Sequence, residues 1–222
     1  MSTSVVRHLV MKDLYLYRHL ITLALVVGLV SIVVSGTSRM AFNVGSVFYL
    51  TTIIAFGVIV VMYAIAQERK DKALLFVLSL PLSPSQYLQA KMLAVLTIFF
   101  VPWAVLTAGI VVLAAVTPIP NGMIPYFLLV STFMLMNFTV LVSVALLTMS
   151  EPVITGVIIL TNLSVTLFFM LLGSIPDIQN HTTSPVTVWT QAFFIVLACE
   201  IGVAVTALTL PMYFGRARRG LA

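Results

Sequence analysis

The chain has 222 residues, of which 61% are hydrophobic and only 8% are charged, and its formal net charge is +5. Soluble domains carry roughly 25% charged residues, so this composition excludes a water-soluble globular protein and predicts an all-α polytopic membrane protein. The single cysteine, Cys199, excludes an intramolecular disulfide and a multi-cysteine metal site, and we predict no metal site.

The first 19 residues have the pattern of an amphipathic helix. Apolar residues recur at steps of three and four between Val6 and Tyr17, and cationic residues such as Lys12 lie on the opposing face. A helix with one aliphatic and one cationic face suits the headgroup plane of a membrane. We therefore predict an interfacial amphipathic helix over residues 1–19, and the alternative is a soluble helix packed on a partner.

Six apolar segments follow, each long enough for the roughly 20 residues that a membrane span requires. Short breaks with proline, asparagine, glycine or charged residues separate them. We therefore assign residues 20–222 to one six-helix transmembrane domain with a cytoplasmic loop at 67–92. The predicted spans are residues 20–38, 46–66, 93–116, 124–149, 153–173 and 186–214.

The basic residues predict the orientation of these spans. All eleven except Arg39 fall before the first span, between the second and third, or after the sixth. An even number of spans places these three groups on one side, and the positive-inside rule makes that side cytoplasmic. We therefore predict a multi-pass protein of the cell (inner or plasma) membrane with cytoplasmic N- and C-termini. The positive charge is a topology signal, and we expect no nucleic acid among the partners.

The loop between spans two and three has the most distinctive sequence. Residues 68–72 are all charged, and residues 73–78 are all apolar. Pro81 ends a helix there because the residue before a proline is disfavoured in the α region. Ser83 and Pro84 then suit the cap and first position of a second helix. From the residues alone, an ordinary positive-inside loop with a solvated charged face is the alternative.

This loop resembles the first cytoplasmic loop of type-2 ABC exporter permeases. In that family an acidic residue follows span two, and then come Arg or Lys, Asp and a leucine-rich helix that ends in Leu-Pro. A Ser-Pro or Ser-Arg turn and an Ala-Lys follow. The N-terminal helix and the six spans are also similar, so the resemblance covers the whole chain. Lys72-Ala73 stands where the family often has a glycine. The matching residues here are Glu68-Arg69-Lys70-Asp71-Lys72, a leucine-rich run ending in Leu80-Pro81, Ser83-Pro84 and Ala90-Lys91.

The resemblance implies a coupling helix that inserts into a groove of a separate cytoplasmic ATPase subunit. That subunit would bind ATP and Mg, and this chain would hold no cofactor. A second permease chain, identical or a paralogue, would complete the translocation path, and the loop at 174–189 would form short re-entrant helices. The implied contacts to the ATPase are Glu68, Arg69, Lys70, Asp71, Lys72, Ser150 and Glu151, and the implied anchors of the coupling helix are Leu74, Leu75, Leu78 and Pro81.

Motifs for chemistry are missing from the sequence. It contains no G-x-x-x-x-G-K-[ST], H-E-x-x-H or G-x-S-x-G pattern, so the chain lacks the usual phosphate-binding loop, and we do not expect an enzyme. ATP hydrolysis would come from another polypeptide.

Glu200 is the one ionisable residue near the middle of a predicted span. A charge at that depth costs at least a few kcal/mol, so it should face the bundle interior, a cavity or a subunit contact. It is either a substrate-pathway or gating residue or a polar link between helices. The polar residues available to meet it are Asn137, Thr139, Thr161, Asn162 and Ser164.

Together these features predict the permease subunit of an ATP-driven ABC exporter, surrounded by membrane lipids. Because the spans carry almost no charge, an amphiphilic, lipid-like or hydrophobic peptide or drug substrate is expected. One alternative is an ion-coupled secondary transporter, which predicts several buried carboxylates or interrupted spans in repeats. The other is a membrane anchor or sensor protein that does not transport.

Overall fold

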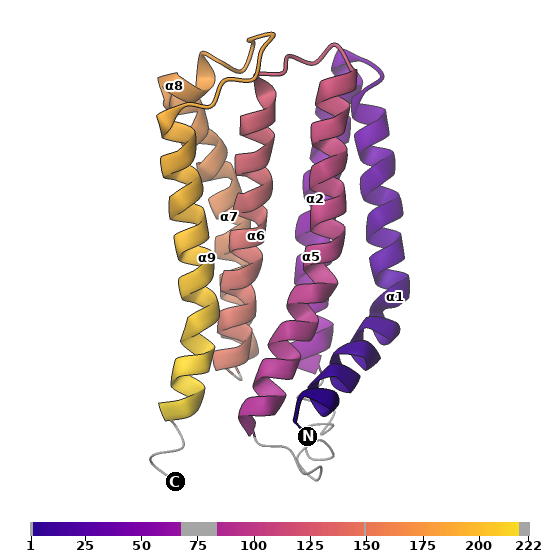
Figure 1. The fold of residues 1–222 in the computed structure, drawn as a ribbon, viewed down its shortest axis with the longest axis vertical. Helices are drawn as coiled ribbons and strands as arrows, with labels where there is room; N and C mark the ends of the chain where they lie inside the picture. The colour runs from indigo at the N-terminus through magenta and orange to yellow at the C-terminus, as the bar shows by residue number, and fades with distance from the viewer. Residues whose placement is uncertain (1, 68–83, 149, 218–222) are drawn as a thin grey trace.

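The computed structural model describes residues 2–67, 84–148 and 150–217. In this part of the chain all regular structure is helical (Figure 1). Six helices are long and apolar enough to cross a membrane, which confirms the predicted number of spans. The elements are α1 (Ser2–Ser35), α2 (Arg39–Val61), the π-helix η1 (Met62–Gln67), α5 (Pro84–Val116), α6 (Met123–Leu147), α7 (Glu151–Ser174), α8 (Pro176–Gln179) and α9 (Gln191–Ala217).

The helices run alongside one another between two ends of a bundle (Figure 1). One end, which we call basal, contains the starts of α1 and α5, the end of α9 and the turn from α6 to α7. At the opposite, distal end lie the links from α1 to α2, from α5 to α6 and from α7 to α9. This arrangement agrees with the prediction that both termini share one side. That this side is cytoplasmic stays a prediction from the basic residues.

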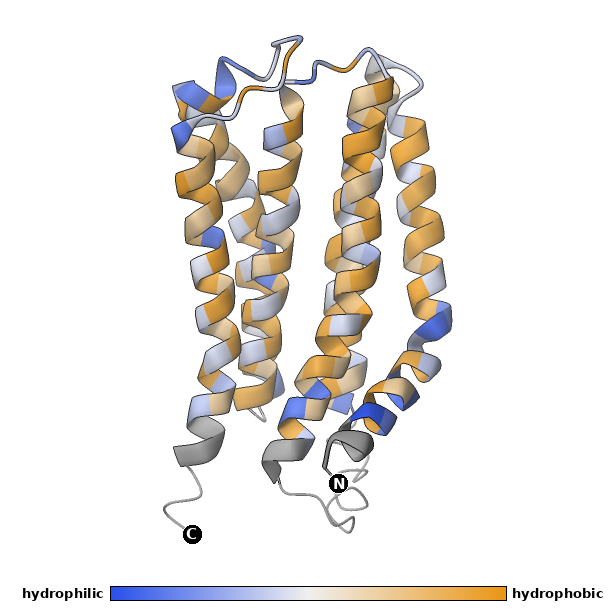
Figure 2. Ribbon diagram, viewed as in Figure 1, coloured by the Kyte–Doolittle hydropathy of each residue, from blue (hydrophilic) through white to orange (hydrophobic). Residues whose placement is uncertain are grey.

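Helix α6 forms the centre of the bundle. It packs against α2, α5, α7 and α9, and 61% of its most apolar window is buried, compared with 11% for α7. Stacked aromatic rings join it to its neighbours: the ring centroids of Phe99 and Phe138 are 3.8 Å apart, and those of Phe133 and Phe168 are 3.9 Å apart. Hydrophobic residues run along the length of the outer helices (Figure 2), and many large apolar side chains of α1, α7 and α9 are exposed, as expected for helices that face lipid.

The N-terminal segment is not a separate helix. Helix α1 is continuous from Ser2 to Ser35, so the predicted division between residues 19 and 20 is not a helix boundary. Figure 1 shows instead that the first part of α1 bends towards the base of α5. The Thr22 hydroxyl donates to the Arg18 carbonyl at 2.9 Å, an arrangement that bends helices. Its placement in the headgroup plane stays a prediction.

The predicted ends of several spans need correction. The first span ends at Ser35 and the fourth at Leu147, slightly earlier than predicted. The sixth begins at Gln191 rather than at residue 186. The apolar residues just before Gln191 belong to the distal loop, where the Thr187 hydroxyl donates to the Asn121 carbonyl at 3.3 Å. The predicted span was too long because it was drawn from hydrophobicity alone, which does not distinguish an apolar loop from a helix.

The two distal links between α5 and α6 and between α8 and α9 are fastened together. The Gly122 backbone N–H donates to the Ser184 carbonyl at 3.0 Å. Gly122 faces the His181 carbonyl so closely that a side chain at this position would collide with it. The described part of this loop contains one short helix, α8, where the resemblance implied short re-entrant helices.

Candidate functional site

The charged loop that the sequence singles out lies outside the described residues. This applies to Glu68, Arg69, Lys70, Asp71, Lys72, Leu74, Leu75, Leu78 and Pro81, whose contact and anchor roles stay predictions. The structure does describe the two helices that lead into and out of this segment. Helix α5 begins at Pro84, which confirms the start predicted from the Ser-Pro sequence.

A π-helix precedes the loop. Helix α2 passes directly into η1, whose residues Ala64, Ile65 and Ala66 are buried. Packing against α6 holds this element in the bundle. π-Helices are rare, and those that occur are often found at functional sites. The irregular helix that leads into residues 68–83 is therefore a candidate functional element.

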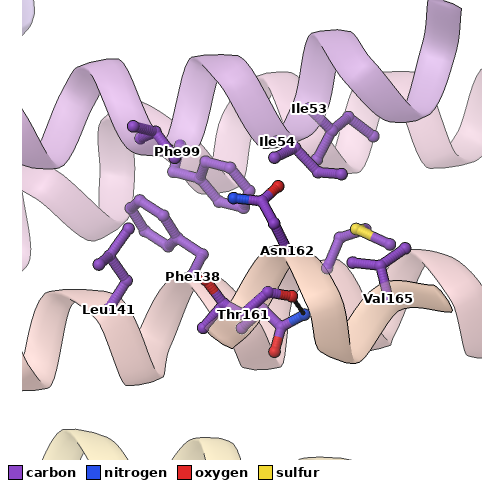
Figure 3. A pocket seen from close by; sticks show the side chains of 12 residues that line it. Ile53, Ile54, Phe99, Phe138, Leu141, Thr161, Asn162 and Val165 are labelled. Atoms are coloured by element: carbon purple, nitrogen blue, oxygen red, sulfur yellow. Dashed lines mark hydrogen bonds between the residues drawn. The ribbon is translucent and has the colours of Figure 1, made fainter. Parts of the chain in front are cut away.

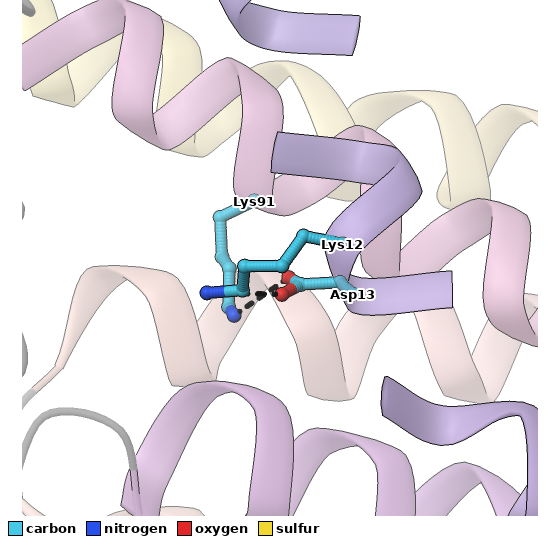
Figure 4. A network of polar contacts seen from close by, with 3 residues as sticks. All are labelled: Lys12, Asp13 and Lys91. Carbon is cyan, nitrogen blue, oxygen red and sulfur yellow. Dashed lines mark hydrogen bonds and ion pairs between the residues drawn. The ribbon is translucent and has the colours of Figure 1, made fainter. Parts of the chain in front are cut away.

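A buried ion pair joins the base of α5 to α1. The Lys91 ammonium donates to the Asp13 carboxylate, with Nζ and Oδ2 2.9 Å apart, and the side chains are only 6% and 8% exposed. Lys12, which is 58% exposed, lies 3.7 Å from the other carboxylate oxygen. Figure 4 shows both lysine side chains reaching towards Asp13. Asp13 therefore has one buried and one exposed cationic neighbour.

Asp13 is not among the residues predicted from the sequence, although a signal for it is present there. Asp13 lies three residues after Val10 and four before Tyr17, on the apolar face of the predicted amphipathic helix. An acidic residue on such a face is seldom buried unless it is paired. The position therefore called for a basic partner, but the sequence offered no indication of which lysine or arginine that would be.

The second predicted contact, Ser150 and Glu151, lies at the basal turn between α6 and α7. Glu151 is exposed and is the first residue of α7, where the helix dipole favours a negative charge. The Ser150 backbone N–H donates to the Thr148 hydroxyl at 3.1 Å. This turn and the base of α5 lie at the same end of the bundle (Figure 1), which is compatible with a shared partner below both.

A large cavity opens between α2, α6 and α7 near the distal end. Its volume is about 600 Å³, within the range of small-molecule sites. The lining is mainly aromatic and aliphatic and includes Tyr126 and Phe169, whose ring centroids are 6.3 Å apart. Asn43, Gln179 and Thr182 add polar side chains. Such a lining suits an apolar molecule with a few polar atoms better than a highly charged one.

A narrower recess of about 30 Å³ lies between the same three helices, and three of the predicted polar residues, Asn137, Thr161 and Asn162, line it. The Asn137 amide donates to the Thr161 carbonyl at 3.3 Å and accepts from the Ser164 hydroxyl at 3.3 Å. The Asn162 amide donates to the Ile158 carbonyl at 2.7 Å, and Figure 3 shows its side chain directed from α7 into the recess. These groups bond to one another and to the backbone, and so link α6 to α7.

Glu200 does not join that cluster, and the prediction that these polar residues meet it is wrong. Its side chain is 3% exposed where α9 packs mainly against α6. Neither carboxylate oxygen has a hydrogen-bond partner among the described residues. The hydroxyl of Thr139, one of the expected partners, instead donates to the Met136 carbonyl at 2.7 Å. The structure confirms that Glu200 faces the bundle interior.

A metal centre has no support in the described part of the chain, where no three histidine, cysteine, aspartate or glutamate side chains come together. The features of chemical interest are therefore a basal ion pair, an apolar cavity and an isolated buried carboxyl group.

The model of a family described as ABC-2 family transporter protein matches residues 8–208, and thus extends from α1 into α9. No curated protein and no solved structure matched the chain.

Proposed function

Because the chain belongs to the ABC-2 transporter family, we propose that it is the permease subunit of an ATP-driven exporter. The observation that carries this proposal is the family match across all six membrane-spanning helices of a chain without a phosphate-binding loop. The energy for transport would come from a separate cytoplasmic ATPase, and a second permease chain would complete the path.

The basal end is where we place the ATPase. By the positive-inside rule this end faces the cytoplasm, and it carries the ends of the helices that flank residues 68–83 as well as Glu151. The charged run Glu68–Lys72 would contact the ATPase, and Leu74, Leu75, Leu78 and Pro81 would hold the coupling helix against the bundle. Ser150 and Glu151 would make a second, smaller contact.

The cavity between α2, α6 and α7 supports an amphiphilic substrate. Its wall is apolar with a few polar groups, and no acidic or basic side chain is among the residues that line it. A lipid-like molecule, a hydrophobic peptide or a drug would fit this chemistry. Export is the direction that the resemblance implies.

Glu200 favours one competing function. A buried carboxyl group without a partner is typical of proton relays in ion-coupled transporters. Within the described residues, however, the only other buried acidic side chain is Asp13, which is paired at the basal end. An ion-coupled mechanism would call for more such groups along a path, so we place it second.

Co-purification tests the proposal. The permease would be expressed with a P-loop ATPase encoded beside it, and we expect a complex whose ATP hydrolysis exceeds that of the ATPase alone. Replacing Arg69, Lys70 and Lys72 by glutamate should abolish this stimulation and leave membrane insertion intact. Reversing Arg39, which lies at the distal end, provides the control. Stimulation that survives the triple reversal would overturn the assignment of the loop, and failure to form any complex would overturn the proposed partnership.

A further inference from the structure

We propose that Asp13 is a positioning residue that, through Lys91, fastens the N-terminal part of α1 to the base of α5, so that the two helices move as one body during transport. This inference rests on the proposed function, and it adds a route by which movement beside residues 68–83 reaches the membrane. The pair is the one place in the described chain where two opposite charges are both withdrawn from water.

The location of the pair suits this role. Helix α5 begins at Pro84, directly after residues 68–83, and Lys91 lies two turns further along the same helix, about 10 Å at 1.5 Å per residue. A displacement at the start of α5 therefore reaches Lys91 through continuous helix. Asp13 lies on the part of α1 that bends towards α5 (Figure 1), so the pair holds this bent part in place.

The energetics of a buried ion pair also favour positioning over stability. Removing two charges from water costs about as much as their attraction returns, and apolar residues of similar size often stabilise as well or better. The pair instead fixes the relative position of α1 and α5, because each buried charge is strongly unfavourable when its partner is moved away. Sliding α1 along α5 would separate Lys91 from Asp13 and is therefore resisted.

Helices α1 and α5 also pack closely against each other further along the bundle, on the distal side of the ion pair. A Cβ atom on Gly28 would lie 2.6 Å from the Leu106 side chain, and one on Gly36 would lie 2.7 Å from that of Leu113. Both glycines thus lie directly against α5, as small residues do where membrane helices approach closely. The ion pair extends this contact to the basal end, so movement of α5 would carry the whole of α1.

Charge exchange tests the proposal in the complete complex with its ATPase. The variants are Asp13→Lys, Lys91→Asp, the double exchange D13K/K91D and the milder Asp13→Asn. Each single reversal should lower transport per ATP hydrolysed about tenfold, the usual size of a coupling between sites, and the double exchange should restore it. Arg18→Asp is the matched control, because it reverses an exposed charge on the same part of α1, outside the Asp13 cluster. It should leave the ratio unchanged.

A distance measurement tests the fastening independently of transport. Spin labels would be placed on cysteines that replace Met11 and Gln89, both exposed, with the exposed Cys199 replaced by alanine. We expect one narrow distance distribution for the native pair and the double exchange, and a broad one for Asp13→Lys and Asp13→Asn. Equal distributions in all variants would overturn the fastening.

The two readouts separate the possible failures. If the native complex neither binds nor stimulates an ATPase, the proposed function fails, and the distances still decide whether α1 is held to α5. If the native complex transports and the single reversals transport equally well per ATP, the positioning role is wrong. Loss of transport in the double exchange despite narrow distances would also contradict it, because the restored attraction would then not suffice.

Discussion

Asp13 and Glu200 are both acidic and both buried, yet their surroundings differ. Asp13 lies at the basal end, 2.9 Å from the Lys91 ammonium and within reach of Lys12. Glu200 lies within the contacts of α9, where neither oxygen has a partner among the described residues. The comparison teaches that burial alone does not distinguish a structural charge from a candidate functional one. The Asp13 carboxylate is paired within this chain. The Glu200 carboxyl group either binds a partner outside the described residues or lowers the stability of the fold.

The largest expected effect comes from breaking the satisfied pair. Lys91→Ala should lower the free energy of unfolding by about 3 kcal/mol, because it leaves the Asp13 carboxylate buried without its main partner. This value is at the lower end of the range for broken buried pairs, since Lys12 stays near Asp13. Thermal unfolding of the purified permease in detergent measures this. Lys12→Ala should change stability by less than about 0.5 kcal/mol, as expected for an exposed ion pair. Equal effects of the two substitutions would show that burial gives the Lys91 pair no special strength.

An intermediate effect of opposite sign is expected at the unsatisfied group. Glu200→Leu removes two polar atoms that lack partners and should raise the free energy of unfolding by about 1–3 kcal/mol. Glu200→Gln is the matched control, because it keeps the shape and a buried polar head and should bring little gain. If Glu200→Leu lowers the unfolding temperature of the assembled complex, Glu200 has a partner there, and the contrast with Asp13 disappears.

The smallest effect is expected at the polar cluster between α6 and α7. Asn137→Leu removes the hydrogen bonds to Thr161 and Ser164 and should cost about 0.6 kcal/mol, the average for such bonds within membranes. Thermal unfolding again gives the value. The exposed Asn162→Leu, whose amide bonds only within its own helix in the structure, serves for comparison and should cost less. A cost at Asn137 comparable with that at Lys91 would mean that neutral polar contacts hold this bundle as firmly as the ion pair does.

The sequence was sufficient to predict the six spans, because long apolar runs between breaks follow directly from the thickness of the hydrocarbon core. It predicted the ends less well. The residues before Gln191 are apolar but lie in a loop that Thr187 fastens to Asn121, and such a long-range contact leaves no local pattern. The start of α5 at Pro84 was predicted correctly because a Ser-Pro helix start is a local signal.

The candidate site was only partly predictable for the same reason. Hydropathy showed that Glu200 is intramembrane, but it could not tell which helices α9 would contact, and so the expected polar partners were wrong. Asp13 carried a local signal, an acidic residue on an apolar helix face, yet its partner Lys91 is 78 positions away in the chain. Which residues face one another across helices is decided by packing that one sequence does not display.

The most direct test of the account is ATP-driven transport in reconstituted vesicles that contain the permease, its P-loop ATPase and a fluorescent lipid-like probe. We predict that probe movement requires ATP, stops when the P-loop lysine of the ATPase is replaced by alanine, and is unaffected by a proton ionophore. Movement that continues without ATP and collapses with the ionophore would contradict the assignment and identify Glu200 as the first residue to examine for ion coupling.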